Sequence, residues 1–515
     1  MKVAMTGTSG NMGREALKQS LELESVEFVR VLLTLKKKNN KLAKKLKKQY
    51  GNRIQIVRGS IADPKACARF VEGVDYVIHM AAVIPPRSDA SFKASEECNK
   101  RGTVALVDAI KARNPQPKFV YISTVALYGN RNEKHLWARV GDPLLVSPFD
   151  TYAMHKLYAE RYVLDADLDS WAVLRQTAML HPNMLKDNVS DGLMFHTALN
   201  APLEWVSSRD SGYLIKRILE RDGKGEVPEF WKKIYNIGAG KKGMETGYDT
   251  FKDGFAIIGG SAEKFFKPHW LATRNFHGVW FEDGEELEKL FSFQRDGVQD
   301  YWKEIARQHK IYALGKLVPA CLIDLFLFRR LRNHYNSPYR WIKNGDEARI
   351  QATFGSMEEA QNLPKKWKDV KLIAKGDFGD YDELRDVELA RRAGKLLDHG
   401  YDDGKPQRLW DLNDMQRAAY FRGGKCLAGQ METGDAYTKL EWQCHDGHVF
   451  SASPYTVLRG GHWCPQCCQP TPWDFDRLAT DSPFFAQVWY DSHREDENRI
   501  YDTDGKGNAV VREFE

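Results

Sequence analysis

The chain has 515 residues, of which 42% are hydrophobic, 12% aromatic and 28% charged. This composition is typical of globular proteins and excludes fibrous and wholly disordered chains, and the length predicts at least two domains. The most apolar stretch, residues 317–328, is interrupted by Asp324 and is shorter than the roughly 20 residues that a bilayer span needs. We therefore predict no membrane span. The apolar run after Lys2 is too short for a secretory signal, which favours a cytoplasmic protein.

The net charge of +6 is unevenly distributed. From Asp411 to the end, 17 acidic residues stand against 10 basic ones, so this part carries a charge of −7. Because nucleic-acid affinity comes largely from clustered cations, we expect no nucleic-acid partner. The densest basic run, residues 36–48, holds eight lysines at helical spacing, and we interpret it mainly as a solvated helix face.

Residues 1 to about 180 alternate short β-branched runs with helical patterns. This alternation predicts an α/β fold with a parallel, doubly wound Rossmann sheet. Between Pro182 and Tyr312 the pattern loosens into a predicted substrate lobe, which includes one more strand-like piece, KIYNIGAG. The six strands expected in the sheet are KVAMTG, EFVRVLLTL, IQIVRG, DYVIHMAA, KFVYIST and SWAVLR.

The remaining chain is predicted to add smaller parts to this first domain. Its helical part contains LVPACLIDLFLFRRLR, which we expect to face the core. Candidate joints are the polar stretch at residues 402–407 and the turn at residues 469–473, both rich in turn formers. The predicted parts are a first domain at 1–312, a mostly helical extension at 313–420, a cysteine-rich module at 421–470 and an acidic segment at 471–515.

A glycine-rich turn follows the first strand directly and precedes a helical pattern. This arrangement places free backbone N–H groups and the positive end of a helix dipole against a pyrophosphate. Gly7 permits the tight turn, Gly10 the close approach of phosphate, and Gly13 the packing of helix on strand. The residues expected to contact a dinucleotide here are Gly7, Ser9, Gly10, Asn11, Met12 and Gly13.

The end of the second strand predicts which dinucleotide is bound. Folds that bind NAD place a carboxylate there for the ribose hydroxyl. This chain instead has Thr34 followed by Lys36, Lys37 and Lys38, and a hydroxyl with cations suits a 2′-phosphate. We therefore predict NADP(H) with Lys36 among its ligands, and NAD(H) as the alternative.

Two residues in the sequence YAMHK point to proton transfer. Tyr152 and Lys156 are four residues apart, which places them on one face of a helix. A nearby cation stabilises a phenolate, so such a tyrosine can exchange a proton while a hydride moves to or from a nicotinamide. Upstream, a predicted strand ends in Ser123 and Thr124, whose hydroxyls can hydrogen-bond the reacting oxygen.

Together these motifs resemble the extended short-chain dehydrogenases/reductases, the family of NAD-dependent epimerases and dehydratases. The resemblance follows the family's order and spacing over roughly the first 300 residues. The residues that carry it are TGTSGNMG at 6–13, HMAA at 79–82, Asn99 with Gly102 and Thr103, STVALYG at 123–129, YAMHK at 152–156, LRQTAMLHP at 174–182 and the later IYNIGAG.

The resemblance implies roles for individual residues. Tyr152 would be the general acid/base, and Lys156 would bind the nicotinamide ribose and lower the pKa of Tyr152. Thr124 would orient the substrate oxygen, and Asn99 would help to fix the active-site helix and a water. The remaining residues implied at the cofactor cleft are Ser60, Ile61, Ala81, Ala82, Ser123, Gln176 and Thr177.

Departures from the family narrow the predicted reaction. Ala178 stands where nucleotide-sugar epimerases often carry Asn, and Val125 with Ala126 stand where dehydratases usually carry Asp-Glu. We therefore predict an oxidoreductase that transfers a hydride between nicotinamide and a carbonyl or secondary alcohol. The alternatives are a sugar or nucleotide-sugar epimerase and a non-catalytic NADP sensor that signals through its cysteine-rich module. A homo-oligomer is a further possibility.

Four cysteines near the C-terminus predict a structural zinc site. Cys426, Cys444, Cys464 and Cys467 supply four thiolates, and the last two form a CxxC pair at a turn. The stretch also resembles a small treble-clef or ribbon-like zinc module. His448 is an alternative ligand that we place beside the metal rather than on it, and a redox role for the CxxC pair is the less favoured interpretation.

Overall fold

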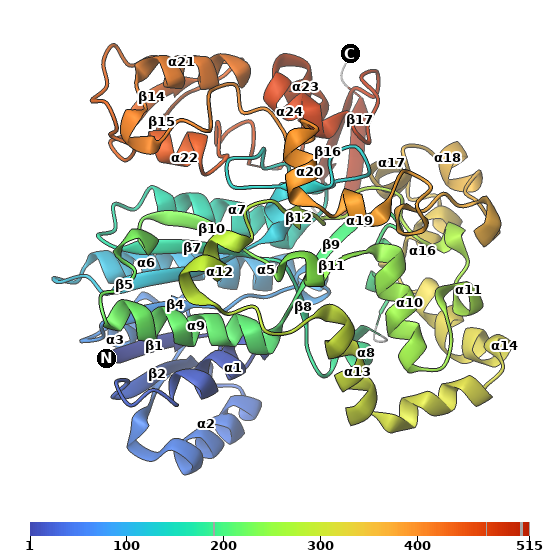
Figure 1. The fold of residues 1–515 in the computed structure, drawn as a ribbon, viewed down its shortest axis with the longest axis horizontal. Helices are drawn as coiled ribbons and strands as arrows, with labels where there is room; N and C mark the ends of the chain where they lie inside the picture. The colour runs from blue at the N-terminus through green and yellow to red at the C-terminus, as the bar shows by residue number, and fades with distance from the viewer. Residues whose placement is uncertain (189–190, 470, 505–507, 514–515) are drawn as a thin grey trace.

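The computed structural model describes residues 1–188, 191–469, 471–504 and 508–513. At its centre lies the predicted parallel sheet, with strand order β10-β7-β5-β4-β1-β2-β3 (Figure 1). This order is that of a doubly wound Rossmann sheet extended by one strand. The strands are β1 (Lys2–Thr6), β2 (Phe28–Leu33), β3 (Ile54–Arg58), β4 (Tyr76–His79), β5 (Lys118–Thr124), β7 (Trp171–Gln176) and β10 (Lys233–Ile237).

The seventh strand differs from the prediction. The KIYNI piece was assigned to the substrate lobe, but it forms β10 and pairs in parallel with β7, from Lys233 opposite Ala172 to Ile237 opposite Gln176. Ile234 and Ile237 are almost completely buried. The chain thus leaves the sheet after β7, builds part of the lobe and returns to the sheet edge.

Helices cover both faces of the sheet, as a parallel sheet requires. Side chains of β2 alternate: Val29 and Val31 face one core, and Phe28 and Leu32 face the other. The first face is covered by α1 (Asn11–Ser20), α9 (Ser208–Gly223) and α12 (Glu285–Phe291). The second face is covered by α3 (Pro64–Phe70), α6 (Gly102–Lys111) and α7 (Thr151–Leu164).

The lysine-rich run forms α2 (Lys37–Tyr50) beside the edge of the sheet. Asn39, Ala43 and Leu46 are its buried residues, whereas all of its lysines are exposed. The solvated face predicted from the spacing is therefore confirmed.

The lobe grows from the carboxyl end of β7 around a small sheet with strand order β11-β9-β8. Its strands are β8 (Ala178–Leu180), β9 (Pro202–Ser207) and β11 (Met244–Thr246), and a separate pair joins β6 (Trp137–Ala138) to β12 (Trp280–Phe281). Its helices and those of the extension include α8 (Met184–Asn188), α10 (Gly247–Ile257), α11 (Ala262–Phe265), α13 (Val298–Gln308), α16 (Pro338–Asn344), α17 (Glu347–Phe354), α18 (Met357–Gln361), α19 (Tyr381–Leu384) and α20 (Val387–Arg392).

The apolar segment expected to face the core is only partly buried, so that prediction was wrong for its outer half. It forms η8 (Lys310–Leu317), α14 (Ala320–Ile323), η9 (Asp324–Phe328) and α15 (Arg329–Arg332). Leu317 and Phe326 are 72% and 75% exposed, whereas Phe328 is 1% exposed. Among the described residues no single helix is long and apolar enough to cross a membrane; Lys310–Leu317 and Ala320–Arg332 meet the length and composition only as a pair, bent by 115°.

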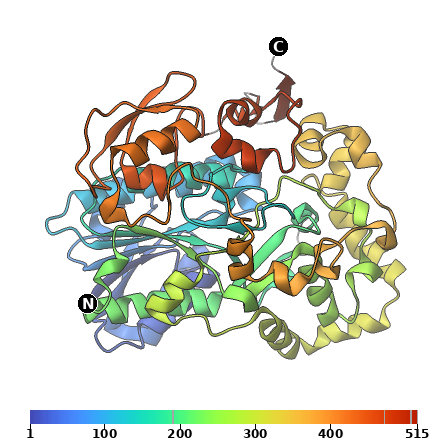
Figure 2. The ribbon, with the colours of Figure 1, turned by 45° about the horizontal axis from the view of Figure 1, so that its top comes forward.

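The cysteine-rich part packs on the sheet face that α7 covers (Figure 2). Trp442, Tyr455 and Trp463 belong to the same apolar core as Phe119 and Tyr121 of β5. Pro470, the predicted end of the module, lies outside the described residues. The elements of the C-terminal part are α21 (Leu412–Phe421), β13 (Lys425–Cys426), β14 (Leu440–Gln443), β15 (Val449–Ala452), α22 (Pro454–Leu458), α23 (Phe475–Asp481), α24 (Pro483–Trp489), β16 (Arg499–Thr503) and β17 (Ala509–Glu513).

Two tyrosines of this part cover β10, the edge strand of the large sheet. The Ile234 amide donates a hydrogen bond to the Tyr455 hydroxyl at 2.9 Å. The Tyr437 hydroxyl donates to the Lys232 carbonyl at 2.8 Å. Unpaired edge groups invite association with other chains, so these contacts close the edge and also join the two parts of the chain.

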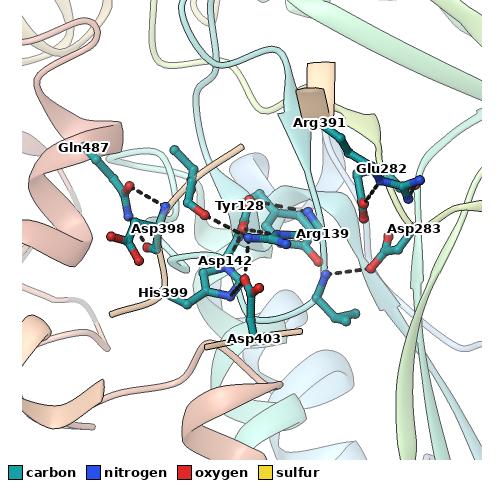
Figure 3. Close-up of polar contacts among 12 residues, drawn as sticks. Tyr128, Arg139, Asp142, Glu282, Asp283, Arg391, Asp398, His399, Asp403 and Gln487 are labelled. Atoms are coloured by element: carbon teal, nitrogen blue, oxygen red, sulfur yellow. Dashed lines mark hydrogen bonds and ion pairs between the residues drawn. The ribbon is translucent and has the colours of Figure 1, made fainter. Parts of the chain in front are cut away.

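Ion pairs fix the segment that leads into the C-terminal part (Figure 3). Asp403, inside the predicted joint at 402–407, lies 2.6 Å from the Arg139 guanidinium and 3.2 Å from His399. Just before it, Asp398 and Gln487 exchange two hydrogen bonds, at 2.8 and 3.0 Å. The segment is thereby tied to the first domain on one side and to α24 on the other.

The contact at the sheet edge gives a stability prediction. In Tyr455→Phe the Ile234 amide loses its acceptor in a buried place, so we expect the free energy of unfolding to fall by about 1–3 kcal/mol. Tyr420→Phe is the control, because Tyr420 is 82% exposed and its change should have almost no effect. Urea unfolding of both variants measures the difference, and equal midpoints would contradict the described closure of the edge.

Candidate active site

A cavity of about 770 Å³ lies at the carboxyl ends of the sheet strands, where doubly wound folds bind their ligands. One end is formed by the glycine turn after β1 and by the ends of β5 and β7, and the other end by the lobe. The predicted site residues that line the cavity are Gly7, Gly10, Asn11, Met12, Gly13, Ala82, Ser123, Thr124, Tyr152, Gln176 and Thr177.

The glycine turn has the geometry that a dinucleotide requires. Gly7 has φ +72°, and a side chain there would collide with the Met80 carbonyl, because its Cβ would lie 2.6 Å from that oxygen. A Cβ at Gly13 would lie 2.3 Å from the Gly7 oxygen. Gly10 caps α1 without any side-chain hydrogen bond, so the first amides of this helix are left for a ligand. These residues fit a bound pyrophosphate.

The HMAA motif holds the turn in place. Thr6 Oγ1 accepts hydrogen bonds from the amides of Met80 and Ala81, each at 3.1 Å. The His79 ring contacts Thr6 Oγ1 at 2.8 Å on one side and Thr103 Oγ1 at 3.0 Å on the other. Burial lowers the pKa of His79 to about 3, so this ring stays neutral and works as a spacer between strand and helix.

The Asn99 side chain hydrogen-bonds the loop that follows β4. Its Oδ1 accepts from the Val83 amide at 2.8 Å, and its Nδ2 donates to the Val83 carbonyl at 2.9 Å and to Ser95. It therefore positions the loop that carries Ala82. Asn99 does not line the cavity.

Thr124 and Tyr152, the predicted orienting hydroxyl and acid/base, both lie on the cavity wall. Thr124 ends β5, and Tyr152 stands in the first turn of α7. Burial raises the pKa of Tyr152 to about 12, although a hydrogen bond with Thr124 acts in the opposite direction. The pair therefore presents a protonated phenol and a hydroxyl to one point of the cavity.

Lys156 lies one helical turn beyond Tyr152 and is buried. Its Nζ donates to the Ile122 carbonyl at 2.6 Å and lies 4.0 Å from the centre of the Tyr121 ring. Burial lowers the pKa of Lys156 to about 7, and Glu160 opposes this effect. Burial is the largest influence on the Tyr152 pKa, and the Lys156 ammonium donates to backbone, so the lowering of that pKa by Lys156 stays a prediction.

A buried ion pair that the sequence reasoning missed stands behind these residues. Glu160, one turn after Lys156 on α7, accepts from Arg175 Nη2 of β7 at 2.6 Å, and the Ser123 hydroxyl donates to the same carboxylate. Burial alone would raise the pKa of Glu160, but the Arg175 guanidinium holds it well below the usual carboxyl range. Arg175 also donates to the Tyr128 hydroxyl at 2.8 Å.

The cysteine-rich part reaches this ion pair directly. His462 Nε2 lies 3.1 Å from Glu160, and Arg175 donates to the Gly460 carbonyl at 2.6 Å. Arg161 of α7 donates to the carbonyls of Trp463 and Ser451. The available signal was Arg175 itself, a charged residue at the end of the predicted strand SWAVLR.

Six predicted cofactor residues lie outside the cavity lining. Lys36 is exposed at the start of α2, and Ser60 accepts a hydrogen bond from the Ala62 amide. Ile61 is buried against α6, and Ser9 is exposed in the glycine turn. Lys156 and Ala81 likewise contact the chain rather than the cavity.

The lobe end of the cavity is apolar. Among the described residues that line it there is no lysine or arginine, and Glu204 is the one carboxylate. Large side chains of this wall include Met194, Trp205, Phe251, Phe255, Phe276, Trp302, Leu327 and Phe328.

Glu204 was also missed by the sequence reasoning. Its carboxylate accepts from the amides of Ala239 and Gly240 at 2.8 and 2.9 Å and from the Phe281 amide at 2.8 Å. Burial raises the pKa of Glu204 to about 7 despite these three donors. It joins the turn after β10 to β12 beside the cavity.

Three of the four predicted zinc ligands come together in the cysteine-rich part. Cys444, Cys464 and Cys467 place their Sγ atoms with His448 Nδ1 in one cluster whose atoms all lie within 4.8 Å of one another. His448 Nδ1 lies 3.4, 3.8 and 3.3 Å from the three sulfurs, in that order. Ligand atoms of a tetrahedral zinc with ordinary bond lengths are separated by about 3.5–3.8 Å.

Cys426 does not join this cluster, so the predicted ligand set differs from the one the structure brings together. It pairs with Trp442 across β13 and β14, two residues before Cys444 on the neighbouring strand. It packs against the apolar core. Two residues along a strand span about 6.6 Å, which leaves the Cys426 thiol beside the core, while the Gly447–His448 turn brings the imidazole to the sulfurs.

Comparison with known protein families supports the resemblance for the first part of the chain. Residues 3–238 match the NAD dependent epimerase/dehydratase family. The match contains the glycine turn, Thr124, Tyr152, Lys156 and the Glu160–Arg175 pair, and it ends just after β10.

Individual proteins are more distant. The D-erythronate dehydrogenase of Cupriavidus necator is 26% identical over 22% of this chain and 34% of its own length. That of Haemophilus influenzae is 22% identical over 32% of this chain and 50% of its own length, so this chain spans at most about half of these relatives. The dTDP-glucose 4,6-dehydratase DesIV of Streptomyces venezuelae has 23% identity and a TM-score of 0.48 over 61% of this chain and 98% of its own. Residues 3–238, a little less than half of the chain, are thus the part that matches the NAD dependent epimerase/dehydratase family.

Proposed function

We propose that this protein is an NAD(P)-dependent oxidoreductase that interconverts a ketone or aldehyde with the corresponding alcohol. One observation carries the proposal: Thr124 and Tyr152 lie on the wall of the same cavity that is lined by a glycine turn shaped for a dinucleotide. The acid/base group and the cofactor turn therefore share one cavity, which hydride transfer coupled to proton transfer needs.

In the reducing direction, Tyr152 gives its phenolic proton to the carbonyl oxygen, and Thr124 hydrogen-bonds the same oxygen. The glycine turn would hold a nicotinamide dinucleotide, whose chemistry would supply the hydride for the carbonyl carbon. The C=O double bond becomes a C–O single bond, and the phenolate left on Tyr152 recovers a proton from water. Lys156, one turn away, would hold the nicotinamide ribose and add positive charge near the phenolate, which opposes the effect of burial on the Tyr152 pKa.

The cavity wall favours a neutral, largely apolar substrate. Beyond the glycine turn, cations commonly hold the carboxylate of a sugar acid or the diphosphate of a sugar nucleotide, and the described lining of the cavity has no lysine or arginine. Ala178, which lines the cavity, has no side-chain group for a diphosphate. The relatives named D-erythronate dehydrogenase support a dehydrogenase reaction, while the apolar wall here supports a different substrate class.

Three exposed lysines favour NADP(H) over NAD(H). Lys36, Lys37 and Lys38 follow β2 at the point where dinucleotide folds hold the adenosine ribose, and they form no ion pair among the described residues. Arg58, at the end of the neighbouring β3, lies close to the Thr34 carbonyl and adds to the positive charge. A 2′-phosphate would find cations on both sides.

The role of Tyr152 is tested by Tyr152→Phe. Removal of the proton donor should lower kcat for carbonyl reduction by about 10²–10⁴-fold, while the affinity for NADPH changes little. Tyr162→Phe is the matched control, because Tyr162 lies on the same helix and bonds Asp108 away from the cavity. NADPH oxidation over a panel of apolar ketones gives the rates. An equally active Tyr152→Phe would refute the proposed role, and sugar interconversion without net cofactor change would favour the epimerase.

The cofactor preference is tested by Lys36→Ala. Loss of one charged contact to a 2′-phosphate should weaken NADPH binding on the order of tenfold and leave NADH binding unchanged. Lys45→Ala, on an exposed face farther along α2, is the control. Fluorescence titration with both nucleotides measures the effect. Two results would contradict the preference for NADP(H). One is that Lys36→Ala loses affinity for NADH and NADPH equally, and the other is that the unchanged protein binds NADH more tightly than NADPH.

We also propose that Cys444, His448, Cys464 and Cys467 hold a structural Zn²⁺. Three thiolates and an imidazole form a common donor set for zinc, and their spacing matches a tetrahedron. With four protein ligands the ion would have no open position, so it would stabilise the fold that places His462 against Glu160 rather than take part in the reaction.

Metal content separates the two possible ligand sets. Purified protein should contain one zinc per chain, and Cys444→Ser or Cys467→Ser should lose it and melt at a lower temperature. Cys426→Ser and the exposed Cys321→Ser should keep the metal. Elemental analysis measures the zinc content of each variant, and thermal melting measures its stability. If Cys426→Ser loses the zinc and His448→Ala keeps it, the four cysteines predicted from the sequence are the ligands instead.

A further inference from the structure

The outer surface of residues 310–330 is unusually apolar. Its helices lie at the periphery of the molecule around α14, drawn in yellow in Figure 1. Exposed large apolar side chains gathered in one segment mark sites of contact with a membrane, another protein or a ligand. The exposed apolar residues are Ile311, Leu314, Leu317, Leu322, Leu325 and Phe326.

Cations are interleaved with these side chains. Lys310, Lys316, Arg329 and Arg330 are exposed, and none of them forms an ion pair within the described part of the chain. The one acidic residue of the segment, Asp324, is paired with Arg332. The surface therefore combines apolar groups with unneutralised positive charge.

The inner side of the same segment borders the candidate active site. Tyr312, Leu327 and Phe328 line the cavity, and Phe328 is almost completely buried. Two short helical pieces bent by 115° thus present one side to the outside and the other to the cavity.

We propose that residues 310–330 lie in the surface of an anionic membrane. Leu317 and Phe326 would enter the boundary between headgroups and acyl chains, and the four cations would contact lipid phosphates. Short amphipathic helices with Lys and Arg beside apolar side chains bind membranes in this way, and each cation near an anionic surface contributes to binding.

The charge of the segment favours a bilayer over a second copy of the chain. Residues 310–332 contain five cations and one carboxylate, so a symmetric contact between two copies would bring these cations together. Anionic lipid headgroups would neutralise the charge of the same cations.

The proposal also specifies where the substrate comes from. Because the segment forms a wall of the cavity, an alcohol or ketone dissolved in the membrane would have a short apolar path to Thr124 and Tyr152. This part rests on the proposed oxidoreductase function, whereas membrane binding itself does not.

Flotation with lipid vesicles tests the membrane contact without any activity. The full chain should float with phosphatidylcholine vesicles that contain 30% phosphatidylserine and bind pure phosphatidylcholine weakly. Leu317→Glu combined with Phe326→Glu should reduce the bound fraction by tenfold or more, and Arg329→Gln with Arg330→Gln should reduce it on the order of tenfold. Leu409→Glu, which changes a half-exposed leucine elsewhere, is the control for added charge.

Each outcome decides the question, provided that circular dichroism shows all variants to be folded. No flotation of the unchanged protein, or equal flotation of all variants, overturns the proposal. A dimer that Leu317→Glu with Phe326→Glu dissolves, without flotation, would assign the surface to a second copy instead. Flotation without turnover of any carbonyl compound would keep the membrane contact and remove only the proposed activity.

Discussion

The buried ion pair between Glu160 and Arg175 is the interaction on which the rest of the structure depends. It joins α7, which carries Tyr152 and Lys156, to β7 in the central sheet, and it receives the Ser123 hydroxyl from the strand that ends in Thr124. Two fully buried charges are costly unless each is paired and hydrogen-bonded, and here both are. Helix α7 is thereby fixed in register with the strand ends.

The C-terminal part completes this interaction rather than standing apart from it. His462 and the Gly460 carbonyl contact Glu160 and Arg175, and both lie just before Cys464. The cluster of Cys444, His448, Cys464 and Cys467 therefore sits a few residues from groups that position α7. A part of the chain outside the family match at residues 3–238 thus helps to shape the candidate active site.

The sequence allowed much of the first domain and its site to be predicted, because those features depend on local rules. Glycine spacing, strand patterns and the Tyr152–Lys156 interval are all readable over a few residues. The placement of β10, the exposure of Phe326 and the choice of His448 over Cys426 depend on which distant segments pack together. Side chains from residues 193–328 form the apolar cavity wall without any motif, so this wall became visible only in three dimensions.

The most direct test of the account follows a labelled hydride. The protein is incubated with NADPH that carries deuterium at the transferable position and with a panel of apolar ketones, and the products are analysed by mass spectrometry. We predict an alcohol that is one mass unit heavier than the product formed with unlabelled NADPH. Tight NADPH binding without deuterium in any product, or label transfer only to sugar nucleotides, would contradict the proposed reaction of the cavity.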